Sequence, residues 1–381
     1  MRIPTMLHDA DTRFVAATAL LIALGLIFLS SASAPLAYDR FGARSYYLVH
    51  QLYSGVLPGV ILFLLAARLR TSFLERVGPW VLVGSVVLLL LVFIPGLGVF
   101  RGGSRSWLNL GIVTFQPSEI AKVGLILALA AWATVRRPAW FHVQAWAKGF
   151  LPFLAVLGSV LGIVVLQPDI GTLSILAAIG VAMAFAAGMR LRHLALLIAG
   201  GVASFGALVA AAPYRVARLT AFLHPELDPQ GIGYQVNQAL LAVGSGGLFG
   251  QGLGHSRQKF SFLPEVISDS IFAIIAEEIG FVFSVAFLAL IAYVIARVLA
   301  NAFQANDAFD RLVLVGIAAW WGVQSVVNIG AMVGLLPLTG LPLPFVSFGG
   351  TALAVSMGAA GIVVNLSKKR VAPARYRRAT V

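Results

Sequence analysis

Apolar runs of about 20 residues recur along the whole chain, and they restrict the fold more than any other feature. A helix of that length crosses the ~30 Å hydrocarbon core of a bilayer. Within lipid every backbone N–H and C=O must be paired inside the chain, so such runs form helices. Hydrophobic residues make up 60% of the sequence and charged residues 11%, against about 45–50% and about 25% in soluble domains. The sequence therefore predicts an all-α, polytopic integral membrane protein.

The apolar runs predict about ten transmembrane helices in a single domain that covers residues 1–381. Their expected ranges are 14–33, 47–67, 78–98, 116–135, 149–166, 170–189, 194–212, 270–296, 312–334 and 347–367. The first run ends in Ala32-Ser33-Ala34, which resembles a signal-peptidase site. That run is long for a signal peptide, and its leader carries Asp9 and Asp11. We therefore expect an uncleaved first helix.

The 27 Lys and Arg residues are unevenly divided between the two sides of the predicted bundle. Most of them, including the tail after residue 367, lie on one side when the N-terminus is placed inside. The positive-inside rule then predicts cytoplasmic N- and C-termini. This bias and attraction to anionic membrane lipid account for the net charge of +13. The basic residues are scattered over loops without interleaved aromatics, so nucleic-acid binding is not expected. The chain has no cysteine, which excludes disulfides and Cys-ligated metals.

One loop, at about 213–269, is far longer than an ordinary connection and faces outward on this topology. Val236, Leu240, Leu241 and Val243 recur at helical spacing, which predicts a short helix on or in the bilayer surface. The glycines between Gly244 and Gly254 permit tight turns and close approach to a ligand. A mobile connector is the alternative reading of these glycines.

Ionisable residues inside predicted spans mark candidate functional positions. Glu119 and Lys122 are three residues apart on one helix face, a spacing that allows an ion pair with either a structural or a binding role. Asp169 follows Gln167-Pro168, and its simplest role is to cap the helix that begins after it.

Four carboxylates occur in LPEVISDSIFAIIAEEIG, residues 263–280, beside a strongly apolar run. Asp269 lies at the outer end of the eighth predicted span, where partial desolvation raises the pKa of a carboxyl toward values useful in a general base. Its alternative role is an N-cap for that helix. Glu277 lies about 80° round the helix and ~12 Å deeper, where it can line the same crevice. Glu278 points away, and for it a separate structural pair is expected. From these residues alone, the prediction is an outward-facing polar cavity with acids, arginines and a glycine-rich loop.

Several stretches resemble the SEDS family of shape, elongation, division and sporulation proteins. They are SAS at 31–33, QPSEIAK at 116–122, PDIGT at 168–172, GYQVNQALLAVGSGGLFGQGLGHSRQKFSFLPE at 233–265, DSIFAIIAEEIGF at 269–281 and NIGAMVGLLPLTGLPLPFVSFGG at 328–350. The matches run in family order across nearly the whole chain. GLGHSRQKF followed by LPE is similar to the FtsW and SpoVE branch. Where members have TDFIF, this chain has Ser268-Asp269-Ser270-Ile271-Phe272, so it keeps the acid and changes its neighbours.

The resemblance implies a peptidoglycan glycosyltransferase that polymerises lipid II on the outer face of the cytoplasmic (inner) membrane. It implies Asp269 as catalytic base, with inversion at the anomeric carbon and therefore no glycosyl-enzyme intermediate. The substrate-binding residues that it implies are Arg105, Glu119, Lys122, Arg215, Arg218, Tyr234, Gln235, Gln258, Lys259 and Glu265. Asp169, Glu277 and Ser347 are expected to support them. A divalent cation, Mg or Mn, is expected to be shared with the substrate pyrophosphate, and no organic cofactor is expected.

The resemblance also implies a partner, a class B penicillin-binding protein that crosslinks the glycan, together with other divisome or elongasome proteins. Two alternative functions remain. A lipid II flippase would need a polar path through to the cytoplasmic side, whereas the inner halves of the predicted helices are apolar apart from Glu277, Glu278 and Lys122. A non-catalytic divisome scaffold would tolerate Asp269→Asn, which would inactivate the enzyme.

Overall fold

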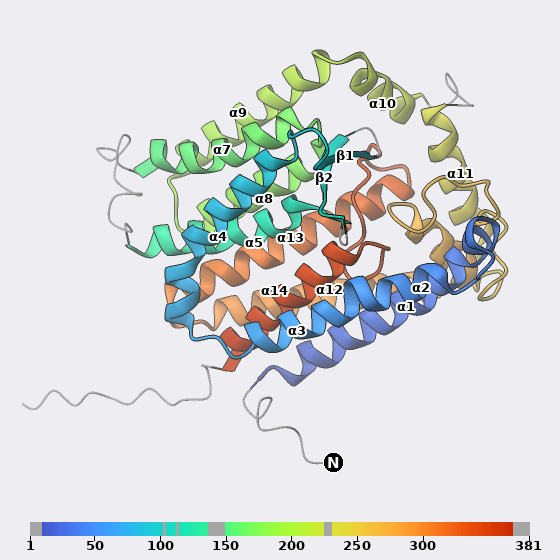
Figure 1. The fold of residues 1–381 in the computed structure, drawn as a ribbon, viewed down its shortest axis with the longest axis horizontal. Coiled ribbons are helices and arrows are strands. Elements are labelled where there is room, and N and C mark those ends of the chain that lie inside the picture. The colour runs from blue at the N-terminus through green and yellow to red at the C-terminus, as the bar shows by residue number, and fades with distance from the viewer. Residues whose placement is uncertain (1–9, 102–103, 112–113, 136–148, 225–230, 369–381) are drawn as a thin grey trace, which may run out of the picture.

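The computed structural model is a bundle of roughly parallel and antiparallel helices capped at one end by loops and short elements (Figure 1). The structure describes residues 10–101, 104–111, 114–135, 149–224 and 231–368. Within these ranges, eight helices are long and apolar enough to cross a membrane, and two shorter apolar helices lie among them. The described chain is thus a mostly helical, multi-pass membrane protein.

The bundle helices follow the predicted order, with bounds set by local residues. They are α1 (Thr12–Phe41), α2 (Tyr46–Gln51) with the π-helix η2 (Leu52–Val56) and α3 (Leu57–Ala66), α4 (Thr71–Leu91), α5 (Pro117–Val135), α7 (Leu151–Leu166), α8 (Ile170–Ala186), α9 (Leu191–Ala210), α12 (Ile271–Phe303), α13 (Ala308–Met332) and α14 (Gly350–Lys368). The helix α1 runs eight residues beyond its predicted end and stops at Gly42, whose φ of 69° suits a left-handed C-cap.

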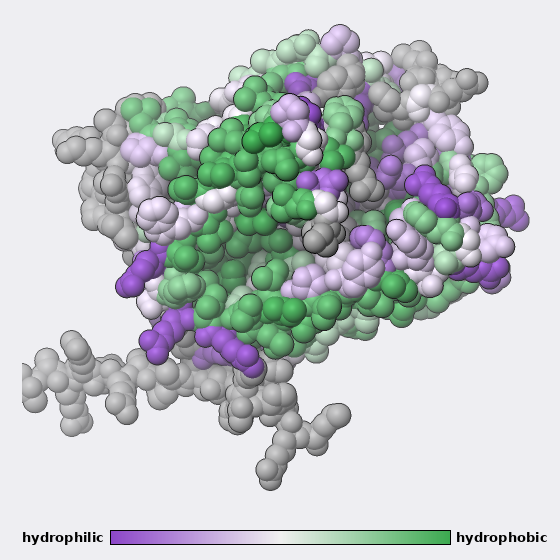
Figure 2. Space-filling view, viewed as in Figure 1, coloured by the Kyte–Doolittle hydropathy of each residue, from purple (hydrophilic) through white to green (hydrophobic). Residues whose placement is uncertain are grey.

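The helices differ in how much of their surface the protein itself covers. Most residues of the apolar stretches of α5, α13 and α14 are buried, whereas those of α9 and of Tyr46–Ala66 are mostly exposed. Figure 2 shows apolar side chains spread over the middle of the bundle, with hydrophilic ones gathered toward its ends. This pattern is expected of helices whose outer faces contact lipid tails.

The first and last helices meet at one end of the bundle. The backbone N–H of Asp11 donates to Ser367 Oγ at 3.2 Å. The Asp11 carboxylate also accepts from Arg297 at 2.8 Å and from Asn301 at 3.1 Å, so α1, α12 and α14 are joined here. The two ends of the described chain therefore lie on the same side, as the even number of predicted spans requires.

The opposite end carries the elements between the spans. Strands β1 (Gly98–Arg101), β2 (Ser104–Asn109) and β3 (Thr114–Phe115) form an antiparallel sheet that the sequence analysis did not predict. The long loop contains α10 (Pro213–Leu223) and α11 (Ile232–Ser245). The second of these is the helix predicted from the spacing of Val236, Leu240, Leu241 and Val243. Residues 246–270 follow as a series of turns.

The helix α12 is broken at Gly280, whose φ of 74° and ψ of −179° lie outside the helical region. The turns after α11 pair with the broken backbone from both sides of the break. Gln251 and Gly252 donate to the carbonyls of Glu277 and Glu278, and Phe281 donates to Gly247. Side chains at Gly250 and Gly280 would collide with the opposing backbone, so this contact requires glycine. The predicted single span thus consists of two helical pieces held together by the glycine-rich loop.

Candidate functional site

Asp269 lies in the last turn before α12 and beneath the long loop, with 8% of its surface exposed. Its backbone carbonyl accepts a hydrogen bond of 2.8 Å from the Asn328 side chain on α13. The N-cap of α12 is Ser270, so the alternative role of Asp269 as that cap is wrong. The cause is a turn in which Ser270 N–H donates to Glu265 C=O and places Asp269 one residue too early.

The Asp269 carboxyl is poorly satisfied for a buried group. Among the described residues, no partner lies within hydrogen-bond distance of its Oδ1 atom. The pKa of Asp269 is raised to about 7, chiefly by burial and next by the negative charge of Glu265. Smaller opposing effects come from the Asp269 backbone N–H, the Arg218 charge and the Gln235 amide. The carboxyl can therefore take up and release a proton near neutral pH.

Several predicted site residues surround this carboxyl. Glu265 is exposed, and its carboxylate accepts from Ser268 Oγ at 2.6 Å. Gln235 on α11 donates to Ser270 Oγ at 3.0 Å, and the neighbouring Tyr234 is half-buried. Ser347 Oγ donates to the Ser268 carbonyl. The structure thus gathers these residues from α11, the turns before α12 and the segment before α14.

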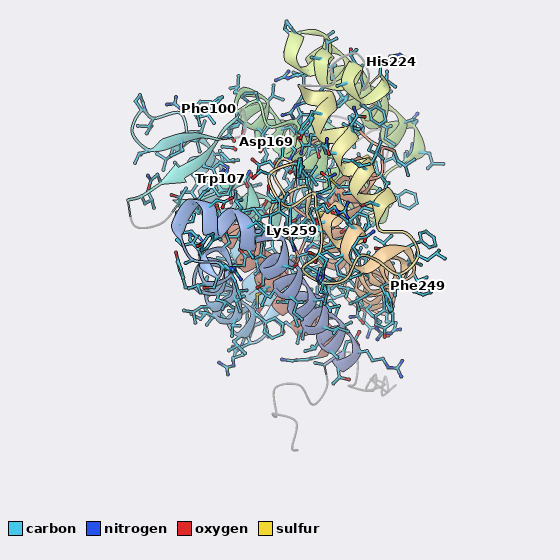
Figure 3. The ribbon with its side chains drawn as sticks, turned by 90° about the vertical axis from the view of Figure 1, so that its right-hand side faces the viewer. Phe100, Trp107, Asp169, His224, Phe249 and Lys259 are labelled. Carbon is cyan, nitrogen blue, oxygen red and sulfur yellow. The ribbon has the colours of Figure 1, made fainter. Side chains whose placement is uncertain are left out.

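The predicted cations have different surroundings. Arg218 on α10 is half-buried, and its charge acts on Asp269. Arg215, one turn earlier, donates to the Leu208 carbonyl at 2.7 Å. Arg105 lies on β2, half-buried beside Trp107. Figure 3 looks onto this end of the molecule, with Trp107 on the sheet at one side and α10 and α11 at the other.

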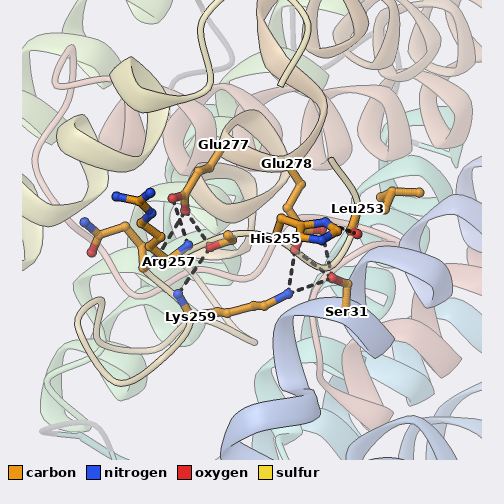
Figure 4. A network of polar contacts seen from close by, with 9 residues as sticks. Ser31, Leu253, His255, Arg257, Lys259, Glu277 and Glu278 are labelled. Carbon is orange, nitrogen blue, oxygen red and sulfur yellow. Dashed lines mark hydrogen bonds and ion pairs between the residues drawn. The ribbon is translucent and has the colours of Figure 1, made fainter. Parts of the chain in front are cut away.

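Glu277 and Glu278 both turn toward the glycine-rich loop (Figure 4). Glu277 accepts hydrogen bonds from Ser256 Oγ and from the backbone N–H groups of Arg257 and Gln258. Glu278 forms a buried ion pair of 2.8 Å with Lys259, and Ser31 Oγ on α1 donates to the same carboxylate. The structural pair expected for Glu278 is therefore present.

This pairing changes the environment predicted for two site residues. The Lys259 ammonium, expected to bind substrate, is buried and compensated by Glu278. Gln258 is also buried, and its Oε1 atom has no partner among the described residues. Glu277, expected to line the crevice of Asp269, instead holds the backbone of the glycine-rich loop.

Glu119 and Lys122 form the ion pair that their spacing predicts, with 2.7 Å between Oε1 and Nζ. Lys122 is fully buried and also donates to Gln324 Oε1 at 3.0 Å. The amide of Gln324 donates onward to the carbonyl of Pro342 at 2.7 Å. The pair thus joins α5 to α13 and to the segment before α14 inside the bundle.

Asp169 caps α8, as predicted. Its carboxylate accepts from the Thr172 N–H at 3.0 Å and from the Thr172 hydroxyl at 2.8 Å. It also accepts from Gln116 Nε2 at 3.3 Å, which links the start of α8 to the residue before α5. Its contacts are those of a supporting residue.

Gln324 and Asn328 were not predicted as site residues. They hold the segment at 341–342 through the carbonyls of Pro342 and Leu341. Both are buried in α13. A signal existed, because two amides four residues apart inside an apolar run lie on one helix face and need partners.

Fold and site together define a multi-pass membrane protein with a buried acid beneath an extramembrane loop. The family model FTSW_RODA_SPOVE, described as "Cell cycle protein", matches residues 11–372. The chain belongs to this family.

Individual relatives cover almost the whole chain. It is 39% identical over 359 residues to stage V sporulation protein E of Bacillus subtilis (strain 168), covering 94% of this chain and 97% of the relative. It is 37% identical over 369 residues to a probable peptidoglycan glycosyltransferase FtsW of Trichlorobacter lovleyi, covering 96% and 95%.

Two solved structures share the fold. One chain, from the study "Structural coordination of polymerization and crosslinking by a peptidoglycan synthase complex", matches with a TM-score of 0.76 and 30% identity. The rod shape determining protein RodA of Thermus thermophilus matches with a TM-score of 0.70 and 29% identity. Each match covers 96% of this chain and 99% of the other.

Proposed function

We propose that this protein polymerises lipid II on the outer face of the cytoplasmic membrane, with Asp269 as general base. The family and its named relatives make the chain a peptidoglycan glycosyltransferase. The observation that carries the assignment of the base is the Asp269 carboxyl itself. It is buried, its Oδ1 has no partner among the described residues, and its pKa is about 7. A general base works best with a pKa near the operating pH.

The reaction joins an acceptor sugar hydroxyl to the anomeric carbon of a donor glycan. As the new C–O bond forms, the hydroxyl proton passes to the Asp269 carboxylate. The bond from the anomeric carbon to the lipid pyrophosphate breaks, and the pyrophosphate leaves with the electron pair. Attack from the face opposite the leaving group inverts the configuration, so an α-linked donor gives a β-linked glycan.

Negative charge develops on the departing pyrophosphate and needs cations to stabilise it. Arg218 is the first candidate, because its charge already acts on Asp269. Arg215 lies one helical turn away on α10, and Arg105 approaches from the sheet. Lys259 contributes less in this conformation because Glu278 neutralises it.

A divalent cation, Mg or Mn, would supply further charge neutralisation at the pyrophosphate when bound. The described residues contain no group of three His, Cys, Asp or Glu side chains that could hold a metal ion. The exposed Glu265 carboxylate beside Asp269 is an oxygen ligand of the kind these ions prefer. Phosphate oxygens would complete the coordination.

The proposed partner is a class B penicillin-binding protein. The support is the match to a chain from a study of a peptidoglycan synthase complex that coordinates polymerisation and crosslinking.

To test this proposal, purified protein is incubated with labelled lipid II and Mg or Mn, with and without a class B transpeptidase. The products are then resolved by length. We expect a glycan ladder from the wild type and none from Asp269→Asn. The matched control is Asp307→Asn, because Asp307 is an exposed N-cap of α13 and asparagine caps equally well. A ladder of normal yield from Asp269→Asn would contradict the assigned base. If folded wild-type protein made no glycan ladder with its partner, the enzyme function would be rejected in favour of the flippase or the scaffold.

A further inference from the structure

Gln51, the last residue of α2, connects this helix to the segment before α14. Its side chain is almost fully buried, with 1% of the residue exposed. The amide Nε2 donates to the Ser347 carbonyl at 3.3 Å, and Oε1 accepts from the Gly349 N–H at 3.0 Å. One side chain therefore fixes the backbone on both sides of Phe348.

The same backbone segment is bonded to the turn that carries Asp269. The Phe348 N–H donates to the Ile267 carbonyl at 2.8 Å, and Ser347 Oγ donates to the Ser268 carbonyl. The held carbonyls belong to the two residues immediately before Asp269. A continuous set of hydrogen bonds thus runs from Gln51 through residues 347–349 to the backbone at the carboxyl.

The helix geometry next to Gln51 is unusual in a way that supports this contact. Residues Leu52–Val56 form a π-helix directly after it, and such widened turns are frequent at functional sites. Within that turn Gly55 packs against Gly350, where an added Cβ on Gly55 would lie 3.3 Å from the Gly350 Cα. The widened turn therefore brings the end of α2 close to the start of α14.

We propose that Gln51 is a positioning residue for the general base Asp269, acting through residues 347–349. The inference rests on the proposed function, since it concerns the placement of the base in that reaction. A general base must lie within hydrogen-bond reach of the proton it removes. A displacement of about 1 Å at the reacting groups costs roughly a hundredfold in rate.

The variant Gln51→Met keeps the size of the side chain and removes both hydrogen bonds. The matched control is Asn365→Leu, because the Asn365 amide bonds to the carbonyls of Ala66 and Leu69. It therefore links the other end of the same span, Tyr46–Ala66, to α14 at the opposite end of the bundle. We expect both variants to lose similar thermal stability. Only Gln51→Met should lower kcat, by about tenfold to a hundredfold, with KM unchanged.

Two readouts separate positioning from general weakening. The pH–rate profile of Gln51→Met should move to lower pH, because a displaced Asp269 gains contact with water and its pKa falls. In Gln51→Glu the protonated carboxyl can accept from Gly349 and donate to Ser347, so the rate of this variant relative to wild type at the same pH should rise as the pH is lowered toward 6. Equal losses of kcat in Gln51→Met and Asn365→Leu, with unshifted pH profiles, would overturn the proposal.

Hydrogen–deuterium exchange tests the contact without any activity. Amides 268–270 and 347–349 should exchange faster in Gln51→Met than in wild type, and should be unchanged in Asn365→Leu. If the wild type makes no glycan, the proposed function fails, while faster exchange still supports the link from Gln51 to Asp269. Unchanged exchange in Gln51→Met overturns the link whatever the activity.

Discussion

The two acidic regions at the start of α12 lie within ten residues of each other and have opposite environments. Glu277 and Glu278 are buried, and donors from the glycine-rich loop, Lys259 and Ser31 satisfy them. Asp269 is also buried, but its Oδ1 lacks a partner among the described residues and its pKa is raised. Both regions keep carboxyl groups away from water. Hydrogen bonds and an ion pair offset the free-energy cost of burial at Glu277 and Glu278, whereas no such contact among the described residues offsets it at Asp269 Oδ1.

The difference separates carboxyl groups that hold the structure from one that is available for chemistry. A carboxylate that accepts several hydrogen bonds is stabilised in its charged form and gives little driving force for taking up a proton. A buried carboxyl with an empty acceptor position has that driving force, and it needs the remaining structure to hold it in place. Glu277 and Glu278 hold the glycine-rich loop in place, and Asp269, the proposed base, lies just before the same helix.

The largest effect is expected at Asp269. Loss of a general base removes about a hundredfold to ten-thousandfold in rate, so Asp269→Asn should reduce glycan synthesis to near background. Measurement of initial rates with labelled lipid II, at equal amounts of folded protein, checks this. A rate within fivefold of wild type would place Asp269 with the structural acids.

Stability provides a check that the loss of rate in Asp269→Asn is not unfolding. The pKa of Asp269 rises from its ordinary 3.8 to about 7 on folding. Compared with the ionised form, the protonated carboxyl therefore adds to the free energy of unfolding, and this contribution is complete only below the unfolded pKa. That contribution is lost as the pH rises from about 4 to about 7. Asparagine has no such dependence. Thermal unfolding in detergent should therefore show Asp269→Asn gaining stability relative to wild type as the pH rises from about 4 to about 7.

The next largest effect is expected at the buried pair. Glu278→Gln leaves the Lys259 charge uncompensated, and breaking a buried pair in this way costs about 3–5 kcal/mol. The double variant with Lys259→Met should recover much of that loss, because neither charge of the pair is then present. Thermal unfolding of both proteins measures this. A single variant as stable as wild type would mean that the two regions differ less than their contacts indicate.

A tenfold effect per pH unit is expected from the ionisation of Asp269. The base acts in its charged form, and its pKa is about 7. The rate should therefore fall about tenfold for each unit below that pH and level off above it. A pH–rate profile between 5 and 9 measures the midpoint. A flat profile over this range would mean that the carboxyl is ionised throughout, like an ordinary exposed acid.

The smallest effects are expected from the two charges that tune the carboxyl. Glu265 raises the pKa of Asp269 and Arg218 lowers it. Glu265→Gln should therefore move the midpoint of the profile to lower pH, and Arg218→Gln should move it to higher pH. Because the two midpoints are expected to shift in opposite directions, each variant is a control for the other. Shifts in the same direction would point to a general change of the site.

Much of the fold could be predicted because transmembrane helices are set by local composition. All ten apolar runs became helices, and α11 followed from the spacing of its apolar residues. The break at Gly280 could not be predicted, because it depends on a loop some thirty residues earlier reaching the same backbone. The small sheet was missed because its glycines and short strands lie between two long apolar runs.

The residues of the candidate site could likewise be predicted where the signal is local, and could not where it depends on long-range packing. Asp269 stood out because an acid at the end of an apolar span is locally unusual, and the spacing of Glu119 and Lys122 allowed their pair. The partner of Lys259 lies on the same loop–helix unit, but Ser31 lies 228 residues away from it in the chain. Gln51 is likewise 298 residues from Gly349. Contacts of that range depend on how the helices pack, which local patterns do not encode.

The break at Gly280 divides the membrane-spanning helix α12 into two pieces. Its first piece, from Ile271 to Ile279, is bonded through Glu277 and Glu278 to the glycine-rich loop. Its second piece continues to Phe303 and is bonded at Phe281 to the same loop. The angle between the two pieces is thus fixed by a segment outside the helix, because the same loop is hydrogen-bonded to both of them.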